Sequence, residues 1–513
     1  MYIFALTLGF MAALQFYNSL TREKETFSSI IPEKVGMYVC GPTVSGESHL
    51  GHARPFITFD IVYRYLKHLG YQVRYVRNIT DAGHFEEEGR ESEDKISKKA
   101  VLEKLEPMEL VQKYTNLFHW AMRAFNNLEP SIEPTATGHI VEQIVMIEKI
   151  IQDGYAYVVN GSVYFDVEKY HKDFGAKGMQ YGILSGRVLE EQLETTRELE
   201  SQDEKRNKTD FALWKNAAPE HIMRWQSPWG VGFPGWHIEC SAMSTKYLGE
   251  EFDIHGGGMD LQFPHHECEI AQSAVCNHKI PARFWLHNNM ITINGKKMGK
   301  SYNNVIKLSE LFAGTHEILT QGYSPMTVRF FILQTHYRST LDFSNEALQA
   351  AEKGLKRIWE AFSYLRKIQI EKKDASATDT DLENKVLEVL NGLEKDMNDD
   401  LNTAKVLASL FELVPVINSM KDGKISLSAI SSKTFEYLQL QFNTYLVDIF
   451  GLTDESKHDD DKLTAVLQLI GEIRKDARSR KDFATSDKIR NQLLAAGIQL
   501  KDEKDGGMSW ELI

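Results

Sequence analysis

The chain has 513 residues, of which 42% are hydrophobic and 26% charged, and its formal net charge is −13 at pH 7. This length predicts about three domains, and the ordinary composition excludes a disordered chain, a small disulfide scaffold and a protein that lies mostly in a membrane. The acidic balance excludes unspecific adhesion to nucleic acid, and four cysteines in so long a chain are typical of a reduced, cytoplasmic protein.

An apolar run at residues 3–14 opens the chain, but it is shorter than a membrane span and no basic residue precedes it. We therefore expect neither secretion nor a membrane anchor. Met11 opens a conventional polar sequence, so residues 1–10 are interpreted as lying upstream of the true start. Residues 1–30 are expected to form an N-terminal segment.

A first structural unit is indicated by the pattern that follows. Alternating side chains at residues 35–39 predict a strand, and residues 40–54 predict a loop rich in glycine and proline. Helical spacing of apolar side chains at residues 57–69 predicts a helix, and residues 71–80 predict a second strand. Strand, loop, helix and strand begin a doubly wound sheet, whose ligands bind beyond the carboxyl ends of the strands.

Two Asn-Gly pairs, at residues 160–161 and 294–295, lie between alternating runs and predict tight hairpins. Helical spacing at residues 345–368 and again at 382–413 has almost no strand signal. The C-terminal third is therefore expected to contain a helical bundle.

The first candidate site is His49-Leu50-Gly51-His52, in the predicted loop. Two imidazoles near a helix start can donate hydrogen bonds to phosphate oxygens, and Gly51 lets a nucleotide approach the backbone. In isolation, surface histidines beside a turn are the simpler interpretation of so short a motif.

The second candidate is the segment Lys297-Met298-Gly299-Lys300-Ser301, just after a predicted hairpin. Its two lysines could neutralise the charge that develops on departing pyrophosphate. A solvated basic turn is the alternative, and it loses weight because the histidine pair stands upstream in the expected order.

A third candidate is a metal site. His265 and Glu269 are four residues apart, so a helix would place them on one face, and Cys40 and Cys240 could add two thiolates. Two thiolates, an imidazole and a carboxylate suit zinc. From spacing alone, the rival ligands are Cys268 and His266.

A fourth candidate is the segment His255-Gly256-Gly257-Gly258-Met259-Asp260, which follows a strand-like run at residues 252–254. Backbone without side chains could approach a flat ligand such as adenine or ribose, and Asp260 could accept a hydrogen bond from a hydroxyl. A flexible turn is the alternative interpretation.

Taken in this order, the motifs resemble the class I aminoacyl-tRNA synthetases, and within them the family that acts on cysteine. The segments that carry the resemblance are YVCGPTV, HLGHAR, RYVRNITD, PGWHIECSAM, FDIHGGGMDLQFPHHECEIAQS, KMGKS and DDLNTA. The resemblance runs from about Leu14 to the last residues.

The resemblance implies a Rossmann-type α/β catalytic domain with an insertion, followed by a helical bundle and a small C-terminal domain. The implied bounds are 31–300 for the catalytic domain with its insertion at about 125–230, 301–345 for a stem-contact region, 346–452 for the bundle and 463–513 for an anticodon-binding domain. Small polar residues at 372–381 and charged residues at 454–462 predict exposed linkers.

The resemblance also implies roles for individual residues. Its catalytic residues are His49, His52, Lys297 and Lys300, and its ATP-binding residues are His49, Gly51, His52, Gly256, Gly257, Gly258, Asp260 and Lys300. The implied zinc ligands are Cys40, Cys240, His265 and Glu269, and the implied cysteine pocket contains Cys40, Thr80 and Trp236. This assignment decides against Cys268 and His266 as ligands.

Beyond residue 463, a predicted helix carries Arg474, Arg478 and Arg480, and Trp510 follows near the end. Local positive charge and an aromatic ring could contact an unpaired base of an anticodon. An ordinary solvated helix is the alternative, since acidic residues offset part of the charge.

The implied activity forms cysteinyl-adenylate from ATP and L-cysteine and transfers the cysteine to tRNA(Cys). One Zn²⁺ per chain would recognise the substrate thiolate, and Mg²⁺ would accompany ATP. We expect a cytoplasmic monomer that contacts no membrane. The alternatives are a ligase that joins cysteine to an amino sugar and a catalytically inactive RNA-binding zinc protein.

Three positions depart from the family pattern. Gly299 replaces a serine in the lysine loop, residues 82–93 lengthen an acidic segment, and Phe233 stands where an arginine often precedes the PGW motif.

Overall fold

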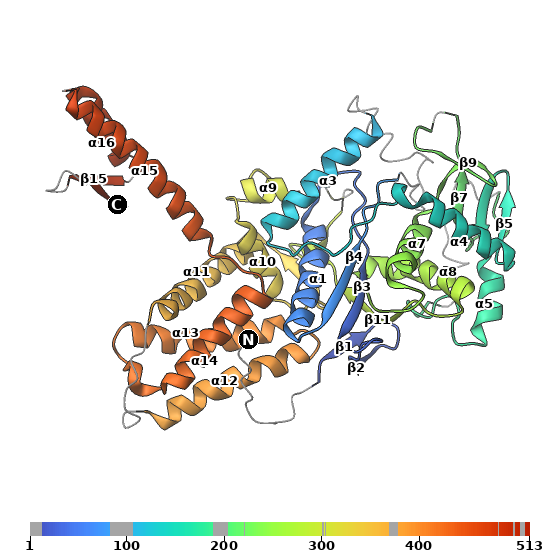
Figure 1. Ribbon diagram of the computed structural model, residues 1–513, viewed down its shortest axis with the longest axis horizontal. Helices are drawn as coiled ribbons and strands as arrows, with labels where there is room; N and C mark the ends of the chain where they lie inside the picture. Colours follow the sequence, from blue (N-terminus) through green and yellow to red (C-terminus); the bar gives the residue numbers. More distant parts are fainter. Residues whose placement is uncertain are drawn as a thin grey trace. The chain divides into compact units, whose positions relative to one another are not determined.

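The computed structural model in Figure 1 describes most of the chain and divides it into two compact units, Met1–Leu452 and Thr453–Ile513. The described residues are 13–82, 106–187, 204–219, 221–299, 302, 304–368, 378–480, 482–495, 498–502 and 508–512. The predictions for residues 1–10, for residues 83–93 of the acidic loop and for Lys300 lie outside them.

A parallel sheet at the centre of the first unit confirms the Rossmann-type α/β prediction. Its strand order is β11 (Ala282–Asn288), β10 (Phe252–Gly258), β3 (Lys34–Val39) and β4 (Gln72–Arg77), and the helices beside it are α1 (Leu50–His68), α7 (Trp236–Leu248) and α8 (Glu267–Asn277). Met37 and Val39 of β3 pack with α1, whereas Tyr38 packs with α7 on the opposite face. A short hairpin of β1 (Gln15–Asn18) and β2 (Glu23–Thr26) precedes the sheet.

Helix α1 begins at Leu50, so the predicted loop is shorter than expected. The His49 side chain caps the helix by accepting a hydrogen bond from the Gly51 amide, and His52 accepts one from the His49 amide. The prediction was wrong because Pro55 was interpreted as loop punctuation, whereas it lies inside the helix. The histidine motif is therefore the first turn of a helix.

Strand β10 continues through Gly258, so a turn at the three glycines is also wrong. A side-chain carbon built on Gly256 would lie 2.2 Å from the Phe59 ring of α1, and one on Gly257 would lie 2.8 Å from His266. At these two positions glycine is required by the packing of the protein itself.

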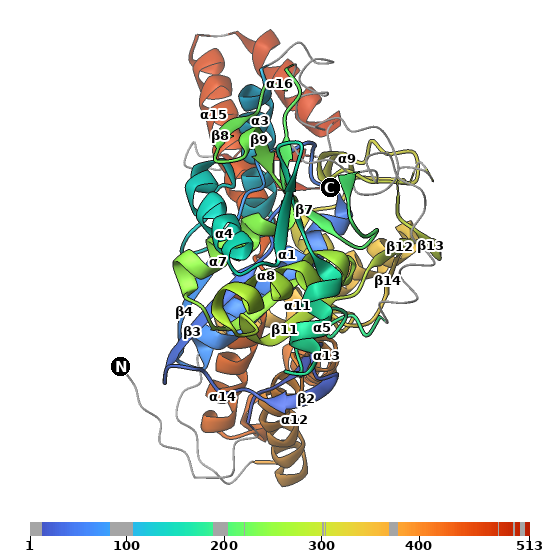
Figure 2. The ribbon, with the colours of Figure 1, turned by 90° about the vertical axis from the view of Figure 1, so that its right-hand side faces the viewer.

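The insertion forms an antiparallel sheet of its own, in the strand order β5-β6-β7-β9-β8. Its elements and those that lead to it are α3 (Pro107–Ala124), the short helix η1 (Thr137–His139), α4 (Ile140–Gln152), β5 (Ala156–Val159), β6 (Ser162–Phe165), α5 (Val167–Gly175), β7 (Phe211–Asn216), β8 (Trp225–Ser227) and β9 (Gly230–Pro234). Asn160 and Gly161 have φ values of 48° and 81°, which confirms the first hairpin. Figure 2 shows α4, α7 and α8 packed against one another.

The second predicted hairpin is also confirmed, with φ values of 49° and 74° at Asn294 and Gly295. It joins β12 (Ile291–Ile293) to β13 (Lys296–Lys297), and α9 (Leu308–Ala313), α10 (Pro325–Leu333) and β14 (Leu341–Phe343) follow. Strand β14 pairs with β12, so this region forms a small sheet next to the lysine loop.

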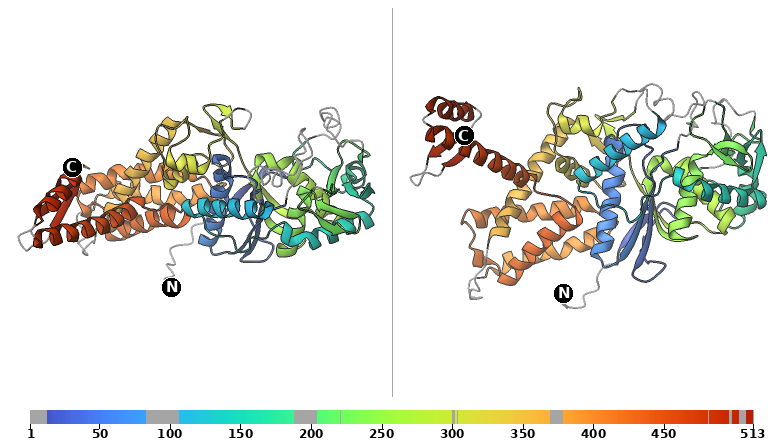
Figure 3. Two further views of the ribbon diagram at one scale, coloured as in Figure 1. Left: turned by 90° about the horizontal axis from the view of Figure 1, so that it is seen from above. Right: turned by 45° about the horizontal axis from the view of Figure 1, so that its top comes forward.

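A helical bundle follows, as predicted, and Figure 3 shows its helices lying side by side. It consists of α11 (Asn345–Lys367), α12 (Thr380–Asn398), α13 (Thr403–Lys421), η7 (Leu427–Ala429), α14 (Ser432–Asn443) and the π-helical turn η8 (Thr444–Ile449). The stretch 382–413 is not continuous, because Asp400 and Leu401 adopt positive φ between α12 and α13. Asp400 accepts hydrogen bonds from the Tyr17 amide and the Tyr337 hydroxyl, which fixes this break.

Helix α13 is long and apolar enough to cross a membrane by length and composition alone. However, its apolar residues Val406, Leu410 and Ile417 are buried in the core of the first unit. Such a helix is typical of a bundle core.

The second unit begins with α15 (Glu455–Ser479), so the prediction of a linker at residues 454–462 is wrong. The physical reason is that Glu and Lys form helices well, and acidic residues near a helix N-terminus stabilise its dipole. Helix α16 (Phe483–Ala495) and a hairpin of β15 (Ile498–Asp502) and β16 (Met508–Leu512) complete the unit. In the other predicted linker, residues 372–377 lie outside the described part of the chain, and α12 already begins at Thr380.

Candidate functional site

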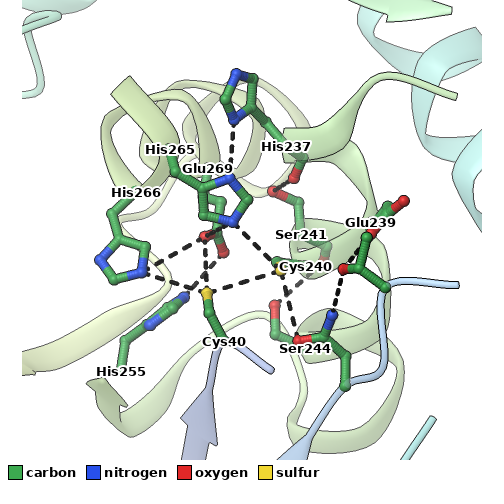
Figure 4. Close-up of polar contacts among 12 residues, drawn as sticks. Cys40, His237, Glu239, Cys240, Ser241, Ser244, His255, His265, His266 and Glu269 are labelled. Atoms are coloured by element: carbon green, nitrogen blue, oxygen red, sulfur yellow. Dashed lines mark hydrogen bonds and ion pairs between the residues drawn. The ribbon is translucent and has the colours of Figure 1, made fainter. Parts of the chain in front are cut away.

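Four buried side chains that can ligate a metal meet beyond the carboxyl end of β3, as Figure 4 shows. Cys40 follows β3, Cys240 lies on α7, and His265 and Glu269 come from the segment that enters α8. The two Sγ atoms are 3.7 Å apart, and His265 Nε2 lies 3.4 Å from Cys240 Sγ and 3.2 Å from Glu269 Oε1. The structure thus brings together the predicted set across about 230 residues of sequence.

The dimensions of this cluster fit a tetrahedral zinc site. With Zn–S near 2.3 Å and Zn–N near 2.05 Å, tetrahedral angles separate two sulfurs by about 3.8 Å and a sulfur from a nitrogen by about 3.6 Å. The corresponding separations here are 3.7 Å and 3.4 Å, and Cys40 Sγ lies 3.7 Å from Glu269 Oε1. The donor set and its spacing therefore match zinc.

The rival thiol lies elsewhere. Cys268 is buried on α8, and its sulfur lies 3.4 Å from the Tyr181 hydroxyl. The rival imidazole is closer, because His266 Nε2 lies 3.3 Å from Cys40 Sγ. With His255, it forms a second group that shares Cys40 and Glu269 with the first.

His255 was expected to belong to the glycine-rich candidate and not to the metal site, yet its Nε2 lies 2.9 Å from Glu269 Oε2. His266 Nδ1 is 2.8 Å from His287 Nε2, and His237 Nδ1 is 2.9 Å from His265 Nδ1. The signal for His255 was present in the sequence, because it precedes the three glycines, but nothing in the spacing connected it to Cys40.

Burial dominates the electrostatics of this cluster. It raises the pKa of the Cys40 thiol and, likewise, the pKa of the Cys240 thiol. It also lowers the pKa of His266, which keeps that ring neutral. A divalent cation reverses the shift at coordinating thiols, because it favours the thiolate form.

The predicted amino-acid pocket borders the cluster. The Trp236 ring centroid lies 4.2 Å from that of His265, and Thr80 is buried near Cys240 through Asn78 and Glu239. Thr80 Oγ1 donates to Glu239 Oε2 at 2.9 Å and accepts from Asn78 Nδ2 at 3.0 Å.

Asn78 and Glu239 were not singled out from the sequence. Asn78 Oδ1 also accepts a hydrogen bond from the Gly41 amide, next to Cys40, and Glu239 is fully buried. They fix the orientation of the Thr80 hydroxyl and the start of the loop after β3.

The two histidines of the HLGH motif stack, with ring centroids 3.8 Å apart. Each Nδ1 accepts a backbone hydrogen bond, from Gly51 to His49 and from His49 to His52. In a neutral imidazole the hydrogen then resides on Nε2. Burial lowers the pKa of His52 to about 3, so this ring is neutral near pH 7 and presents an Nε2–H donor.

The lysine loop lies against this motif. A side-chain carbon built on Gly51 would lie 2.6 Å from Met298 Cε, so the two segments are in contact. Lys297 ends β13 and is exposed, whereas Lys300 lies outside the described residues. The structure therefore places Met298, the neighbour of Lys297, against the histidine motif.

Of the predicted nucleotide-binding glycines, Gly256 and Gly257 are filled in by Phe59 and His266. Among the described residues, Asp260 is the one close to the position of a side chain on Gly258, and it is exposed just after the end of β10. Gly258 and Asp260 are thus the part of this run that reaches solvent, whereas Gly256 and Gly257 are buried. Phe233, the departure before the PGW motif, is buried in β9 and stacks on His221.

The predicted anticodon residues are not equivalent. Arg474 is 3% exposed, so it does not present its charge to solvent, whereas Arg478 on α15 and Arg480 just after it are exposed. Arg480 pairs with Asp476 at 3.5 Å, a weak surface contact. Trp510 lies in β16 opposite Leu500.

Comparison with known families gives matches over both main parts of the first unit. The family described as tRNA synthetases class I (C) catalytic domain matches residues 26–353, and the DALR domain matches residues 392–454. The match to the DALR domain covers most of the bundle after α11.

Curated relatives match almost the whole chain. A protein of Parabacteroides distasonis named Cysteine--tRNA ligase is 58% identical over 97% of this chain and 99% of its own length. Proteins with the same name from Bacteroides thetaiotaomicron and Chlorobaculum tepidum are 57% and 46% identical, each over 97% of this chain and 99% and 98% of their own lengths.

Solved structures resemble the fold at low sequence identity. A ternary complex of Agrobacterium radiobacter K84 agnB2 LeuRS with tRNA and LeuAMS superposes with a TM-score of 0.55 at 11% identity, covering 83% of this chain and 85% of that one. Mycobacterium tuberculosis methionyl-tRNA synthetase with methionyl-adenylate gives a TM-score of 0.51 at 13% identity, covering 81% and 89%. These likenesses show the class I synthetase fold.

Proposed function

This chain belongs to the cysteine–tRNA ligase family of class I aminoacyl-tRNA synthetases, and we propose that it activates L-cysteine with ATP and transfers it to tRNA(Cys). One observation carries the proposal. The stacked histidine pair follows β3 in the chain, and the thiol-rich cluster lies beyond the carboxyl end of the same strand. In such folds, nucleotides and substrates bind at this end of the sheet.

The histidines act by positioning the nucleotide. His49 and His52 are held by backbone hydrogen bonds in the tautomer whose Nε2–H can donate to phosphate oxygens. Because the pKa of His52 is about 3, the donor keeps this form throughout the neutral range. Lys297 and Lys300 supply positive charge to the pyrophosphate that leaves, and Gly258 and Asp260 accept the nucleoside end.

The zinc ligands in this proposal are Cys40, Cys240, His265 and Glu269, whose separations support a tetrahedral site. A bound zinc ion would supply a soft cation for the thiolate of the substrate. Thr80 and Trp236 then line the pocket for the rest of the cysteine. An apolar pocket separates near-isosteres such as cysteine and serine by roughly 10- to 200-fold, so a thiolate-selective site adds discrimination that shape does not supply.

The proposed partners are tRNA(Cys), L-cysteine and ATP with Mg²⁺, and the proposed state is a cytoplasmic monomer. The second unit, with Arg478 exposed on α15 and Arg480 exposed just after it, is the proposed anticodon-reading part. Relatives named Cysteine--tRNA ligase match 97% of the chain, which favours tRNA over an amino sugar as the acceptor of cysteine.

The test is cysteine-dependent exchange of pyrophosphate into ATP, followed by charging of tRNA(Cys) with labelled cysteine. We expect exchange with cysteine, far less with serine, and charging of tRNA(Cys). Exchange without charging would favour the amino-sugar ligase, and absence of both would overturn the proposal.

A further inference from the structure

The side chain of Asn304, just after the lysine loop, forms hydrogen bonds with two backbone groups of that loop. Asn304 Oδ1 accepts a hydrogen bond from the Gly299 amide at 2.9 Å, and its Nδ2 donates to the Lys297 carbonyl at 3.1 Å. Asn304 is 9% exposed, so water competes little for either bond. The amide therefore fixes the backbone on both sides of Met298.

The residues that follow Asn304 are attached to the histidine motif. The Leu50 amide donates to the Ile306 carbonyl at 3.0 Å, and the Leu308 amide donates to the Ser48 carbonyl at 2.9 Å. These bonds flank His49, which forms a bridge with Lys307. Asn304 thus stands two residues from a segment that is pinned to the start of α1.

We propose that Asn304 is a positioning residue for adenylate formation, whose side-chain amide holds Lys297 to Gly299, the described part of the lysine loop, in register with the histidine pair. This inference rests on the proposed function and deepens it. Met298, between the Lys297 carbonyl and the Gly299 amide that Asn304 binds, contacts Gly51 of the histidine motif. The segment from Lys297 to Gly299 is therefore held by Asn304 on one side and lies against the histidine motif through Met298.

Gly299 makes the hydrogen bonds from Asn304 more important for the order of this segment. Glycine has more backbone freedom than any other residue, so a loop with glycine at this position gains more conformations when an anchoring bond is lost. Loss of the amide would leave the Lys297 carbonyl and the Gly299 amide without this partner. The ammonium group of Lys297 would then occupy more positions, whereas the transition state requires it in one.

The experiment compares Asn304→Ala and Asn304→Asp in the full chain with a matched control, Asn345→Ala. Asn345 is 8% exposed, and its amide also holds a loop, through the Thr320 amide and hydroxyl. We measure kcat and KM for cysteine and ATP in pyrophosphate exchange, the thermal midpoint, and the rate at which trypsin cleaves the native protein after Lys297.

We expect Asn304→Ala to lower kcat by about 10²-fold, with the KM for cysteine close to that of the original chain. Asn304→Asp keeps the acceptor for the Gly299 amide and loses the donor, so its kcat should be intermediate. Cleavage after Lys297 should accelerate in Asn304→Ala. Asn345→Ala should lower the thermal midpoint while kcat and cleavage after Lys297 stay unchanged.

Unchanged kcat in Asn304→Ala overturns the inference, and so does an equal loss of kcat in Asn345→Ala, because the effect would then be general destabilisation. If Asn304→Ala does not fold, Asn304→Asp decides, and a kcat equal to that of the original chain overturns the role. An original chain that shows no cysteine-dependent exchange contradicts the proposed function instead.

Discussion

At the scale of single residues, Cys240 gives the sharpest test of the metal site. Cys240→Ser replaces a thiolate ligand with a hydroxyl, which is a poor partner for zinc. We expect loss of bound zinc and of cysteine activation. The preference for cysteine over serine should fall toward the roughly 10- to 200-fold range that shape alone provides. Metal analysis of the purified protein and pyrophosphate exchange with both amino acids measure these effects.

The matched control is Cys268→Ser, a second buried cysteine of the same region whose sulfur contacts the Tyr181 hydroxyl. It should change neither zinc content nor selectivity. Zinc retained in Cys240→Ser, or lost in Cys268→Ser, would show that the wrong thiol had been assigned.

A second residue-scale prediction concerns pH. Burial lowers the pKa of His52 in the folded protein to about 3, whereas an imidazole in the unfolded chain titrates near 6.5. Between these values the unfolded state binds the proton and the folded state does not, so this group destabilises the fold as pH falls from about 6.5 toward 3. The midpoint of urea denaturation should therefore fall less steeply over this range in His52→Asn. Parallel pH curves for the two proteins would contradict the low pKa.

At the scale of elements, a buried ion pair joins α1 to α10. Arg329 pairs with Asp60, and its guanidinium also donates to the Phe450 carbonyl and to Asn127. Asp60→Asn would leave the buried charge of Arg329 without its counter-ion, which costs about 3–5 kcal/mol. We expect a correspondingly lower midpoint of urea denaturation.

The control is an exposed pair on α4, Lys149 with Asp153 at 3.2 Å. Lys149→Ala should change stability by less than about 1 kcal/mol. Equal effects of the two substitutions would mean that the buried pair does not join these helices.

The elements that the sequence predicted well are those with a local cause. Asn160-Gly161 and Asn294-Gly295 formed the predicted hairpins because both pairs adopt positive φ, which few other residues do readily. The start of α1 was missed although its caps, His49 and His52, are local, because histidine is not among the usual N-cap residues. The break near Asp400, by contrast, depends on partners in β1 and near Tyr337. Partners far away in sequence leave no local signal.

The same distinction applies to the site. Each motif was visible by itself, and the resemblance to a family assigned the four metal-ligating residues. His255, Asn78 and Glu239 were missed because their roles arise only when β10, β4 and α7 meet beyond Cys40.

At the scale of the whole molecule, the division after Leu452 separates the adenylate-forming motifs from the part proposed to read the anticodon. A chain that ends at Leu452 retains all the adenylate-forming motifs and should retain cysteine-dependent pyrophosphate exchange. Its kcat/KM for charging tRNA(Cys) should fall by about tenfold or more, because each lost contact to an unpaired base costs about 1–3 kcal/mol. Unchanged charging would contradict the proposal that Thr453–Ile513 reads the anticodon.

The order of strands in the central sheet has a consequence for folding during synthesis on the ribosome. β10 lies between β3 and β11, but about 210 residues separate it from β3 along the chain. Because synthesis proceeds at about 5–20 residues per second, the edge of β3 that pairs with β10 stays unpaired for roughly 10 to 40 s. During this interval the nascent chain has an unpaired strand edge, and the Cys40 thiol lacks the other side chains of its cluster. We therefore expect the nascent chain to need protection from aggregation that the folded protein does not need.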